Sequence, residues 1–398
     1  MAYSTNTSDE QSLATGIVLT RRILGGVCLL IVLGLLAAGL WPFHRPPNQA
    51  RWLAAGNGLH LGRHNSIVSA DGVMGSCSRD DAGCSIEIWL EPDRKMNTGT
   101  ILTFDNRVDG QLFSVRQEWT DLVVRREPRA RSRRTDGGDI HVDALFHART
   151  PILLTIASGA HGTAVYANGS LVKTVPGFRL SHKDLQGRLI LGDSAVQSDG
   201  WPGELLGLAF YPQDLTADQV LRHHARWIES GRPDRQELEK PTALYLFDEH
   251  AGRVAHSTVS TGVALYLPDR YSIVDKTVME APWKAFRPTW NYWQDVVVNV
   301  GGFIPFGLLA GAYLSLRIPM RWVAPGTIAL GGAISLTIES LQVFLPTRDS
   351  DLTDVLTNTL GTCMGVAMLR WNPAHRAIGR LLDLSQFAAR QLRIGSAN

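Results

Sequence analysis

The sequence predicts a membrane α-helical bundle of four spans joined to an all-β sandwich outside the cytoplasm. Three observations support this fold class. Long charge-free segments alternate with polar sequence in a chain of 398 residues. Arginines cluster at those ends of the segments that a four-span topology places on one side of the membrane. Between the first two segments, short runs of branched and aromatic residues alternate with turn residues, as in antiparallel sheets.

Four apolar segments are candidates for membrane spans: residues 23–40, 296–316, 322–345 and 355–369. A helix of about 20 residues crosses the hydrocarbon core of a bilayer. The fourth segment reaches that length only if residues 352–354 belong to it. The first segment has an alternative as a cleaved signal peptide, because Ala37, Ala38 and Gly39 are small enough for cleavage. Its length and its continuation through Trp41 favour an uncleaved anchor.

Positive charge near the spans predicts the orientation, since short loops rich in Lys and Arg stay in the cytoplasm. The arginines concerned precede the first span, separate the second from the third, and follow the fourth: Arg21, Arg22, Arg317, Arg321, Arg370, Arg376, Arg380, Arg390 and Arg393. Four spans place all of them in the cytoplasm. We therefore expect a multi-pass membrane protein, with both termini cytoplasmic and residues 42–294 extracytoplasmic.

These segments give an expected division of the chain. It comprises a cytoplasmic tail (1–22), a first span (23–41), a sandwich (50–267), a linker (268–294), spans two to four (295–370) and a cytoplasmic amphipathic tail (371–398). The last tail has arginines on one face and apolar residues on another, so it is expected to lie on the inner leaflet. Binding to a partner protein is its alternative role.

The exported region has the pattern of an antiparallel sandwich. "CSIEIWLEP" alternates Ile86, Ile88 and Leu90 with polar and aromatic residues, as in a strand with one face on a core. Asn168-Gly169 lies between two strand-like runs and predicts a two-residue hairpin turn. "LTADQVLRHHARWIESG" predicts one helix, which Thr216 caps and Gly231 ends.

Cys77 and Cys84 both fall in this exported region, in "CSRDDAGC". A disulfide between them is permitted in an oxidising compartment, and two inert thiols are the alternative. Cys28 and Cys363 lie inside predicted spans, where they are expected to act as small apolar packing groups.

Charge gives little indication of a partner, because the formal net charge is only +2. No Walker loop, zinc-finger spacing or dinucleotide glycine fingerprint occurs, and nucleic acid is not an expected partner of an exported domain. "VVRREPRARSRR" is a basic run that could contact an anionic glycan or lipid headgroups. A solvated hairpin loop is the simpler interpretation.

The order of the strand-like pieces is similar to that of laminin-G-like, concanavalin-A-like jelly-roll domains. The matching pieces are "CSIEIWLEP", "TAVYANGSLVKTV" and "LILGD" followed by "GWPGELLGLAFYPQDLTADQV". The resemblance implies binding of glycans or proteins, sometimes with calcium. Asp105 and Asp193 are the only calcium candidates, although strand-end aspartates more often form turns; no other cofactor or metal is expected.

Polar residues interrupt the last three apolar segments. Asp295 and Asn299 lie at the start of the second span, and Glu339 and Gln342 near the end of the third. The remaining members are Arg348 in the following loop and Asp351, Asp354 and Asn358 entering the fourth span. The topology brings these residues to one level of the membrane, facing outward. Ionisable groups at such a depth are costly, so they suggest a site for a headgroup or a proton. The alternative is structural, with helices tied together by hydrogen bonds and an Arg348–carboxylate pair.

"DVVVNVGGFIPFG" together with "ESLQVFLPTRDSDLTDVLTNTLGTCMG" resembles the VanZ-like family of four-span membrane proteins. The matched residues include the polar residues above except Asp295. The sandwich would then be an insertion between the first and second VanZ-like spans. The family takes its name from glycopeptide (teicoplanin) resistance. The resemblance therefore implies a location in the bacterial cytoplasmic (inner) membrane and a role in resistance or in handling envelope polysaccharide.

Three functions follow as hypotheses. The first is a non-enzymatic envelope protein that binds glycan or a peptidoglycan precursor, with membrane lipids around its helices. The second is an intramembrane enzyme acting on a lipid-linked glycan, with Glu339 and Asp351 or Asp354 as an acid/base pair. No activated Ser, Cys or His accompanies these carboxylates, so an enzyme is less expected and no catalytic residue is assigned. The third is a scaffold that recruits a protein partner.

Overall fold

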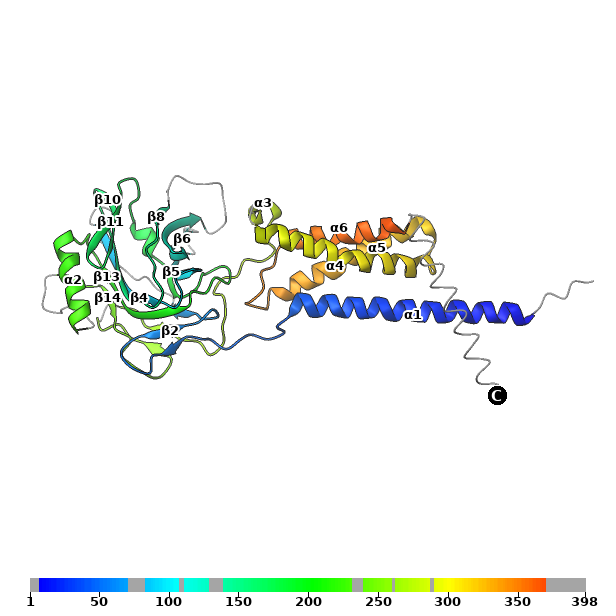
Figure 1. The fold of residues 1–398 in the computed structure, drawn as a ribbon, viewed down its shortest axis with the longest axis horizontal. Coiled ribbons are helices and arrows are strands. Elements are labelled where there is room, and N and C mark those ends of the chain that lie inside the picture. The colour runs from blue at the N-terminus through cyan, green and yellow to red at the C-terminus, as the bar shows by residue number, and fades with distance from the viewer. Residues whose placement is uncertain are drawn as a thin grey trace, which may run out of the picture. The chain divides into compact units, whose positions relative to one another are not determined.

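The computed structural model describes residues 7–70, 83–106, 111–128, 139–230, 239–259, 262–286 and 290–369. The chain forms two compact units (Figure 1). One is Arg45–Lys276, and the other combines Met1–His44 with Thr277–Asn398. Three features singled out in the sequence lie outside the described residues: Cys77, the arginines from Arg129 to Arg134, and the tail beyond Leu369.

The first unit is a β-sandwich of two antiparallel sheets, as the sequence predicts. One sheet contains, in spatial order, β1 (Arg51–Trp52), β2 (Leu59–Leu61), β13 (Gly203–Tyr211), β4 (Cys84–Pro92), β9 (Ile152–Gly159), β10 (Gly162–Ala167) and β11 (Ser170–Val175), with β14 (Ala243–Tyr245) beside β13. The other contains β15 (Val254–Ala255), β16 (Leu265–Tyr266), β3 (Ile67–Ser69), β12 (Arg188–Leu191), β5 (Asn97–Asn106), β6 (Gln111–Trp119), β7 (Asp121–Pro128) and β8 (Ile140–Val142). A 3-10 helix, His182–Leu185, precedes β12.

The core lies between the two sheets and follows the predicted alternation. Ile86, Ile88 and Leu90 are fully buried in it, together with residues of β5 and β6 such as Phe104 and Phe113. The Asn168-Gly169 turn is also confirmed, since Ala167 pairs with Ser170 across it. Both turn residues have positive φ, 49° and 80°, which the tight hairpin turn requires.

Helix α2 (Ala217–Ser230) packs on part of the outer face of the first sheet, so this part is buried. The predicted cap is present: Thr216 Oγ1 accepts from the Gln219 N–H at 3.4 Å, and Gln219 Oε1 accepts from the Thr216 N–H at 2.7 Å. This reciprocal pair is a capping box. Gly231 lies outside the described residues, and the helix ends at Ser230.

The second unit is helical. It contains α1 (Thr7–Leu40), α3 (Pro282–Ala285), α4 (Trp290–Ser315), α5 (Met320–Gln342) and α6 (Leu352–Met368). The four long helices pack on each other through small apolar clusters, for example Phe303 and Phe306 of α4 against Leu36 of α1 and Ile338 of α5.

Glycines permit the close approach of α4 and α6. A Cβ on Gly361 would lie 2.2 Å from the Val300 carbonyl oxygen, and one on Gly365 would lie 2.2 Å from the Ile304 carbonyl oxygen. Only glycine fits at such contacts, which are typical of helices packed in membranes. Gly302 has nothing within 4 Å of its added Cβ, so it takes no part in this contact.

Among the described residues, two helical segments are long and apolar enough to cross a membrane: Arg21–Leu40 and Tyr292–Ser315. Helix α6 has 17 residues. At about 1.5 Å per residue it is roughly 26 Å long, slightly less than a bilayer core of about 30 Å. Helix α5 is longer but carries polar residues along one face, which the next section describes.

Candidate functional site

Glu339 is the most deeply placed carboxylate of the helical unit. It lies in the last turn of α5 and is 1% exposed. Its Oε2 accepts from the backbone N–H of Asp351 at 2.8 Å, and Ser350 Oγ donates to its backbone carbonyl at 3.1 Å. The Glu339 carboxylate therefore lies against the beginning of α6.

Asp351 is the N-cap of α6, and its side chain accepts from the Thr353 N–H at 2.7 Å. The first N–H groups of a helix have no partner within it, and the helix dipole favours negative charge there. Such donors stabilise the carboxylates of Glu339 and Asp351, which act electrostatically on each other and on Asp354.

Two further side-chain bonds join α6 to its neighbours. Asn299 Nδ2 of α4 donates to Asp354 Oδ1 at 2.8 Å. Asn358 Nδ2 donates to Ser335 Oγ of α5 at 2.8 Å, one helical turn deeper than Glu339 and Asp354. Asp295, one turn before Asn299, acts electrostatically on Asp354. We call Asp295, Asn299, Glu339, Asp351, Asp354 and Asn358 the bundle cluster.

Arg348 and Gln342 have a different role from the rest of the predicted set. Arg348 donates from Nε to the Trp41 carbonyl at 2.8 Å and from Nη2 to the Ala38 carbonyl at 3.3 Å. Gln342 Nε2 donates to the Gly39 carbonyl at 2.9 Å. These carbonyls belong to the end of α1, where a helix lacks acceptor partners and favours positive charge. The Arg348 guanidinium thus caps the C-terminal end of α1. The sequence had suggested an ion pair between Arg348 and a carboxylate, and the structure has this cap instead.

A backbone pairing beside the bundle cluster was not predicted from the sequence. The Glu280 N–H donates to the Ser350 carbonyl at 3.1 Å, and the Leu352 N–H donates to the Glu280 carbonyl at 3.1 Å. This isolated bridge fixes the segment before α3 against the α5–α6 loop. No local pattern around Glu280 indicates such a contact, because it depends on two segments far apart in the chain.

The residues of the bundle cluster are better suited to binding a ligand, or to holding the helices together, than to nucleophilic catalysis. Its described members are carboxylates and amides held by backbone N–H groups, hydroxyls and each other. In the described part of the chain, no group of three or more His, Cys, Asp or Glu is arranged to hold a metal ion.

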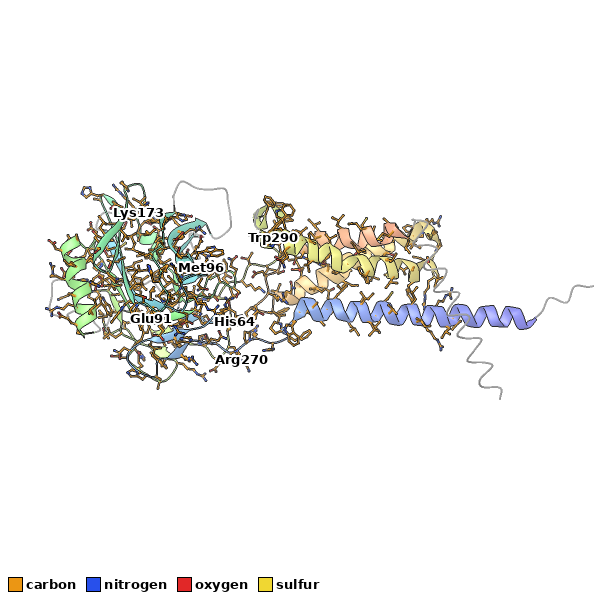
Figure 2. All side chains as sticks on the ribbon, in the orientation of Figure 1. His64, Glu91, Met96, Lys173, Arg270 and Trp290 are labelled. Atoms are coloured by element: carbon orange, nitrogen blue, oxygen red, sulfur yellow. The ribbon has the colours of Figure 1, made fainter. Side chains whose placement is uncertain are left out.

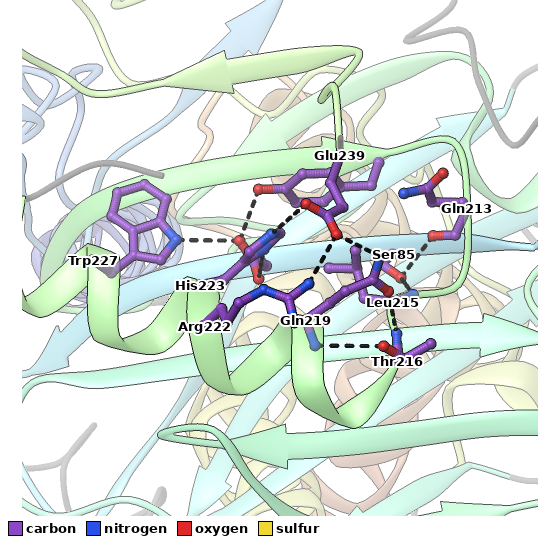
Figure 3. A network of polar contacts seen from close by, with 11 residues as sticks. Ser85, Gln213, Leu215, Thr216, Gln219, Arg222, His223, Trp227 and Glu239 are labelled. Carbon is purple, nitrogen blue, oxygen red and sulfur yellow. Dashed lines mark hydrogen bonds and ion pairs between the residues drawn. The ribbon is translucent and has the colours of Figure 1, made fainter. Parts of the chain in front are cut away.

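A second polar network lies in the sandwich, under α2 (Figure 3). Glu87 is fully buried. Its carboxylate accepts from the Tyr211 hydroxyl at 3.0 Å and from Trp227 Nε1 at 3.1 Å, and His223 Nδ1 lies 2.9 Å away. The alternation of β4 places Glu87 on the outer face, and sequence reasoning did not anticipate that α2 would cover it. His223 and Trp227, four residues apart on α2, are the signal that could have revealed the contact.

Glu239 extends this network on the other side of His223. Its carboxylate accepts from Gln219 Nε2 at 2.5 Å and lies 3.3 Å from Arg222 Nη2 and 3.8 Å from His223 Nε2. Burial of the imidazole acts to lower the pKa of His223, but the hydrogen bond and charge of Glu87, with those of Glu239, raise it overall. His223 therefore sits between two carboxylates, and its protonated form stabilises the docking of α2.

The two calcium candidates do not come together. Asp105 is paired in register with Arg188 at the start of β12, whereas Asp193 follows the end of that strand. Asp193 Oδ1 accepts from the N–H groups of Ser194 and Asp199, both at 2.7 Å, and Oδ2 accepts from the Tyr271 hydroxyl at 2.5 Å. Burial raises the pKa of Asp193 to about 7. Asp193 thus organises a turn.

A groove of about 530 Å³ lies where the free edges of the two sheets meet. We call it the edge groove. Strand β8, the loop after it, the start of β9 and the β10–β11 hairpin line it. Its polar side chains are His141, Asp143, His147, Thr150, Asn168 and Lys173. Figure 2 labels Lys173 on the sandwich. A smaller hollow of about 300 Å³, lined by Trp89, His224 and Trp227, shares Pro151 and Asn168 with it.

The protein therefore combines a β-sandwich with a helical unit in which two described helices are long and apolar enough to cross a membrane. The VanZ/LLP1 family model matches residues 242–372, less than half of the chain. The chain therefore carries a VanZ-like domain, and this domain together with the apolar helices indicates a membrane protein. No curated protein matches the sequence.

Solved structures with a similar fold include proteins described as carbohydrate-binding. One is a protein from Bacteroides ovatus so described (12% identity, TM-score 0.39, covering 54% of this chain and 58% of that one). Two further solved structures that are similar to this chain are a SAP-like pentraxin from Limulus polyphemus (17%, 0.30, 53% and 99%) and the CBM40 domain of a Ruminococcus gnavus IT-sialidase bound to α2,3-sialyllactose (13%, 0.31, 42% and 95%). This chain covers 58% of the Bacteroides ovatus protein, which is less than two thirds of its length. Similarity at this level carries no inference about a ligand.

Proposed function

We propose that this chain is a four-span integral membrane protein of the bacterial cell envelope whose β-sandwich is an exported binding module. The observation that carries the proposal is the polarity of the helices. Their outer faces are apolar, with Leu30 of α1 and Val297 of α4 both 68% exposed and Leu356 of α6 60% exposed. Their buried positions include polar residues such as Ser335 and Thr362. Water favours the opposite arrangement, whereas lipid favours this one.

The ends of the helical unit support the same placement. Trp283 and Trp290 are about four-fifths exposed near the start of α4, and Trp322 is exposed at the start of α5, beyond the other end of α4. Figure 2 labels Trp290. Tryptophan is enriched where helices meet the membrane–water interface. Arg317 and Arg321 lie near Trp322, which favours a cytoplasmic location for that end and an exported sandwich.

The proposed role of the sandwich is to bind an envelope glycan, a peptidoglycan precursor or a protein. The VanZ-like domain of the same chain suggests a connection with teicoplanin resistance or with envelope polysaccharide. We regard binding as a better account than catalysis, because the described carboxylates of the bundle cluster are engaged by helix N–H groups and amides.

Labelling of single cysteines in intact cells tests the topology. Lys173→Cys places an exposed thiol on β11, and Arg317→Cys places one between α4 and α5. Both changes are made in a chain whose four native cysteines are replaced by alanine, so that each variant has a single thiol. A membrane-impermeant maleimide should label the first from outside and the second only after permeabilisation, with the cysteine-free chain as background. Equal labelling of both without permeabilisation, or of neither, would contradict the proposed topology.

We further propose that the bundle cluster is an outward-facing polar site for a lipid or envelope headgroup. Glu339→Gln keeps an oxygen that can accept the Asp351 N–H, so the protein should accumulate normally while its drug-tolerance or envelope phenotype is lost. Arg348→Ala is the comparison variant, because it removes two bonds to α1 and should lower accumulation. A Glu339→Gln protein with normal abundance and an unchanged phenotype would favour a purely structural cluster.

A further inference from the structure

We infer that the edge groove and the adjoining tryptophan hollow together form a binding site for a glycan chain of low net charge. This inference rests on the proposed role of the sandwich as a binding module, and it chooses glycan over protein as the ligand. The two hollows have volumes of about 530 and 300 Å³ and share Pro151 and Asn168, so one elongated ligand can occupy both. Ligand sites typically enclose about 300–1,000 Å³.

The polar groups of the edge groove fit a ligand rich in hydroxyl groups. His147 Nδ1 lies 3.2 Å from the Leu145 carbonyl oxygen and His141 Nε2 lies 3.8 Å from Asp139 Oδ2, so the other nitrogen of each ring can bond a ligand. Asp143 supplies only acceptors when ionised, and Lys173 supplies only donors. A sugar hydroxyl both donates and accepts, so it can use every one of these groups. The opposite charges of Asp143 and Lys173 also give the groove no net preference for a polyanion.

The walls offer the apolar surfaces that a sugar ring also needs. Val142 and Ile152 line the edge groove, and Trp89 lines the hollow beside it. The Trp89 ring meets the Trp227 ring edge-on with centroids 5.4 Å apart, and Trp227 is fixed by its bond to Glu87. Trp89 is partly exposed, and its packing on Trp227 limits its motion, so its exposed part can contact the C–H side of a pyranose. Concave hollows of this volume are typical of sites for small or elongated ligands, which favours a glycan over a flat protein partner.

The site is formed before any ligand binds. Asn168 Oδ1 accepts from the Leu153 N–H at 2.9 Å, and the Asn168 N–H donates to the Leu153 carbonyl at 2.9 Å. These two bonds fix the hairpin turn against β9 at the point where the two hollows join. Little conformational entropy is then lost on binding, which improves affinity.

The test uses the full chain in lipid nanodiscs on an array of neutral and anionic oligosaccharides, followed by titration of the strongest neutral hit. His147→Ala and Lys173→Ala change exposed side chains at the groove, so folding should be unaffected. Each should weaken binding about tenfold, the loss expected for about 1.4 kcal/mol of contact energy. Lys95→Ala, an exposed lysine that does not line the groove, is the matched control and should bind like the unsubstituted chain.

The possible outcomes distinguish an error in the proposed site from an error in the proposed binding function. If the unsubstituted chain binds a glycan and both groove variants bind it equally well, the site is wrong and the binding function survives. If the unsubstituted chain is silent across the array, both the site and glycan binding are overturned. A hit confined to anionic glycans would also overturn the assignment of a ligand with low net charge.

Discussion

Replacement of Glu87 by alanine should release helix α2 from the sandwich. The Glu87 carboxylate is the common acceptor for Tyr211, His223 and Trp227, and the last two belong to α2. The alanine variant removes this acceptor and leaves three buried donors without it. Water cannot replace it easily, because Glu87, Tyr211 and Trp227 are at most 1% exposed.

The expected cost follows from the general behaviour of buried charged networks. Loss of one partner from such a network destabilises a protein by about 3–5 kcal/mol. A whole domain is stable by only about 5–15 kcal/mol, so the loss would be a large part of the total. Glu87→Gln keeps one acceptor oxygen but adds two donors, and it should cost about 1–3 kcal/mol, the range for one unsatisfied group.

Hydrogen exchange of the α2 amides in the full chain measures this effect directly. At about 1.4 kcal/mol for each factor of ten, Glu87→Ala should speed exchange of protected α2 amides by about 100-fold or more. Glu229→Gln, a change to an exposed α2 carboxylate, is the control and should leave exchange unchanged. Unchanged exchange in the Glu87→Ala protein would refute the role assigned to this network.

The same network predicts a pH dependence. Because the pKa of His223 is raised on folding, its contribution to stability is complete below its unfolded pKa of about 6.5. The contribution is lost as the pH rises through the folded-state pKa. After correction for intrinsic exchange rates, α2 should be less protected at about pH 8 than at about pH 6, and His223→Gln should remove this difference. Greater protection at the higher pH would contradict the reasoning.

Three further predictions concern other parts of the molecule. Gly361→Ala should destabilise the helical unit by about 1–3 kcal/mol because its Cβ would meet a carbonyl oxygen, whereas Gly302→Ala has open space and should be neutral or stabilising in thermal melts in detergent. Arg348→Ala should speed hydrogen exchange at the end of α1, and no change there would argue against the cap. Burial raises the pKa of Asp193 to about 7, so this group lowers stability as the pH rises from about 4 to about 7. Asp193→Asn should make the melting temperature of the sandwich depend less on pH over that range. An unchanged pH dependence would exclude Asp193 as its source.

The sequence alone determined those features that short-range patterns encode. The alternation in β4 predicts which residues enter the core, because successive strand side chains point to opposite faces. The Asn168-Gly169 turn and the Thr216 cap depend on a few neighbouring residues, so both could be predicted locally. The polar residues of the last three helices were also visible as interruptions of apolar runs. The resemblance to VanZ-like proteins was visible in the two stretches "DVVVNVGGFIPFG" and "ESLQVFLPTRDSDLTDVLTNTLGTCMG".

Only the tertiary structure decided which of these polar groups meet. Arg348 bonds to carbonyls more than 300 positions earlier in the chain, at the end of α1, and Glu87 is buried by a helix that follows it by well over 100 residues. The edge groove likewise exists only because β8 and β11, the last strands of different sheets, lie beside each other. The physical reason is that periodicity fixes the face of an element on which a side chain lies. The packing of distant elements decides whether that face meets water, lipid or another part of the chain.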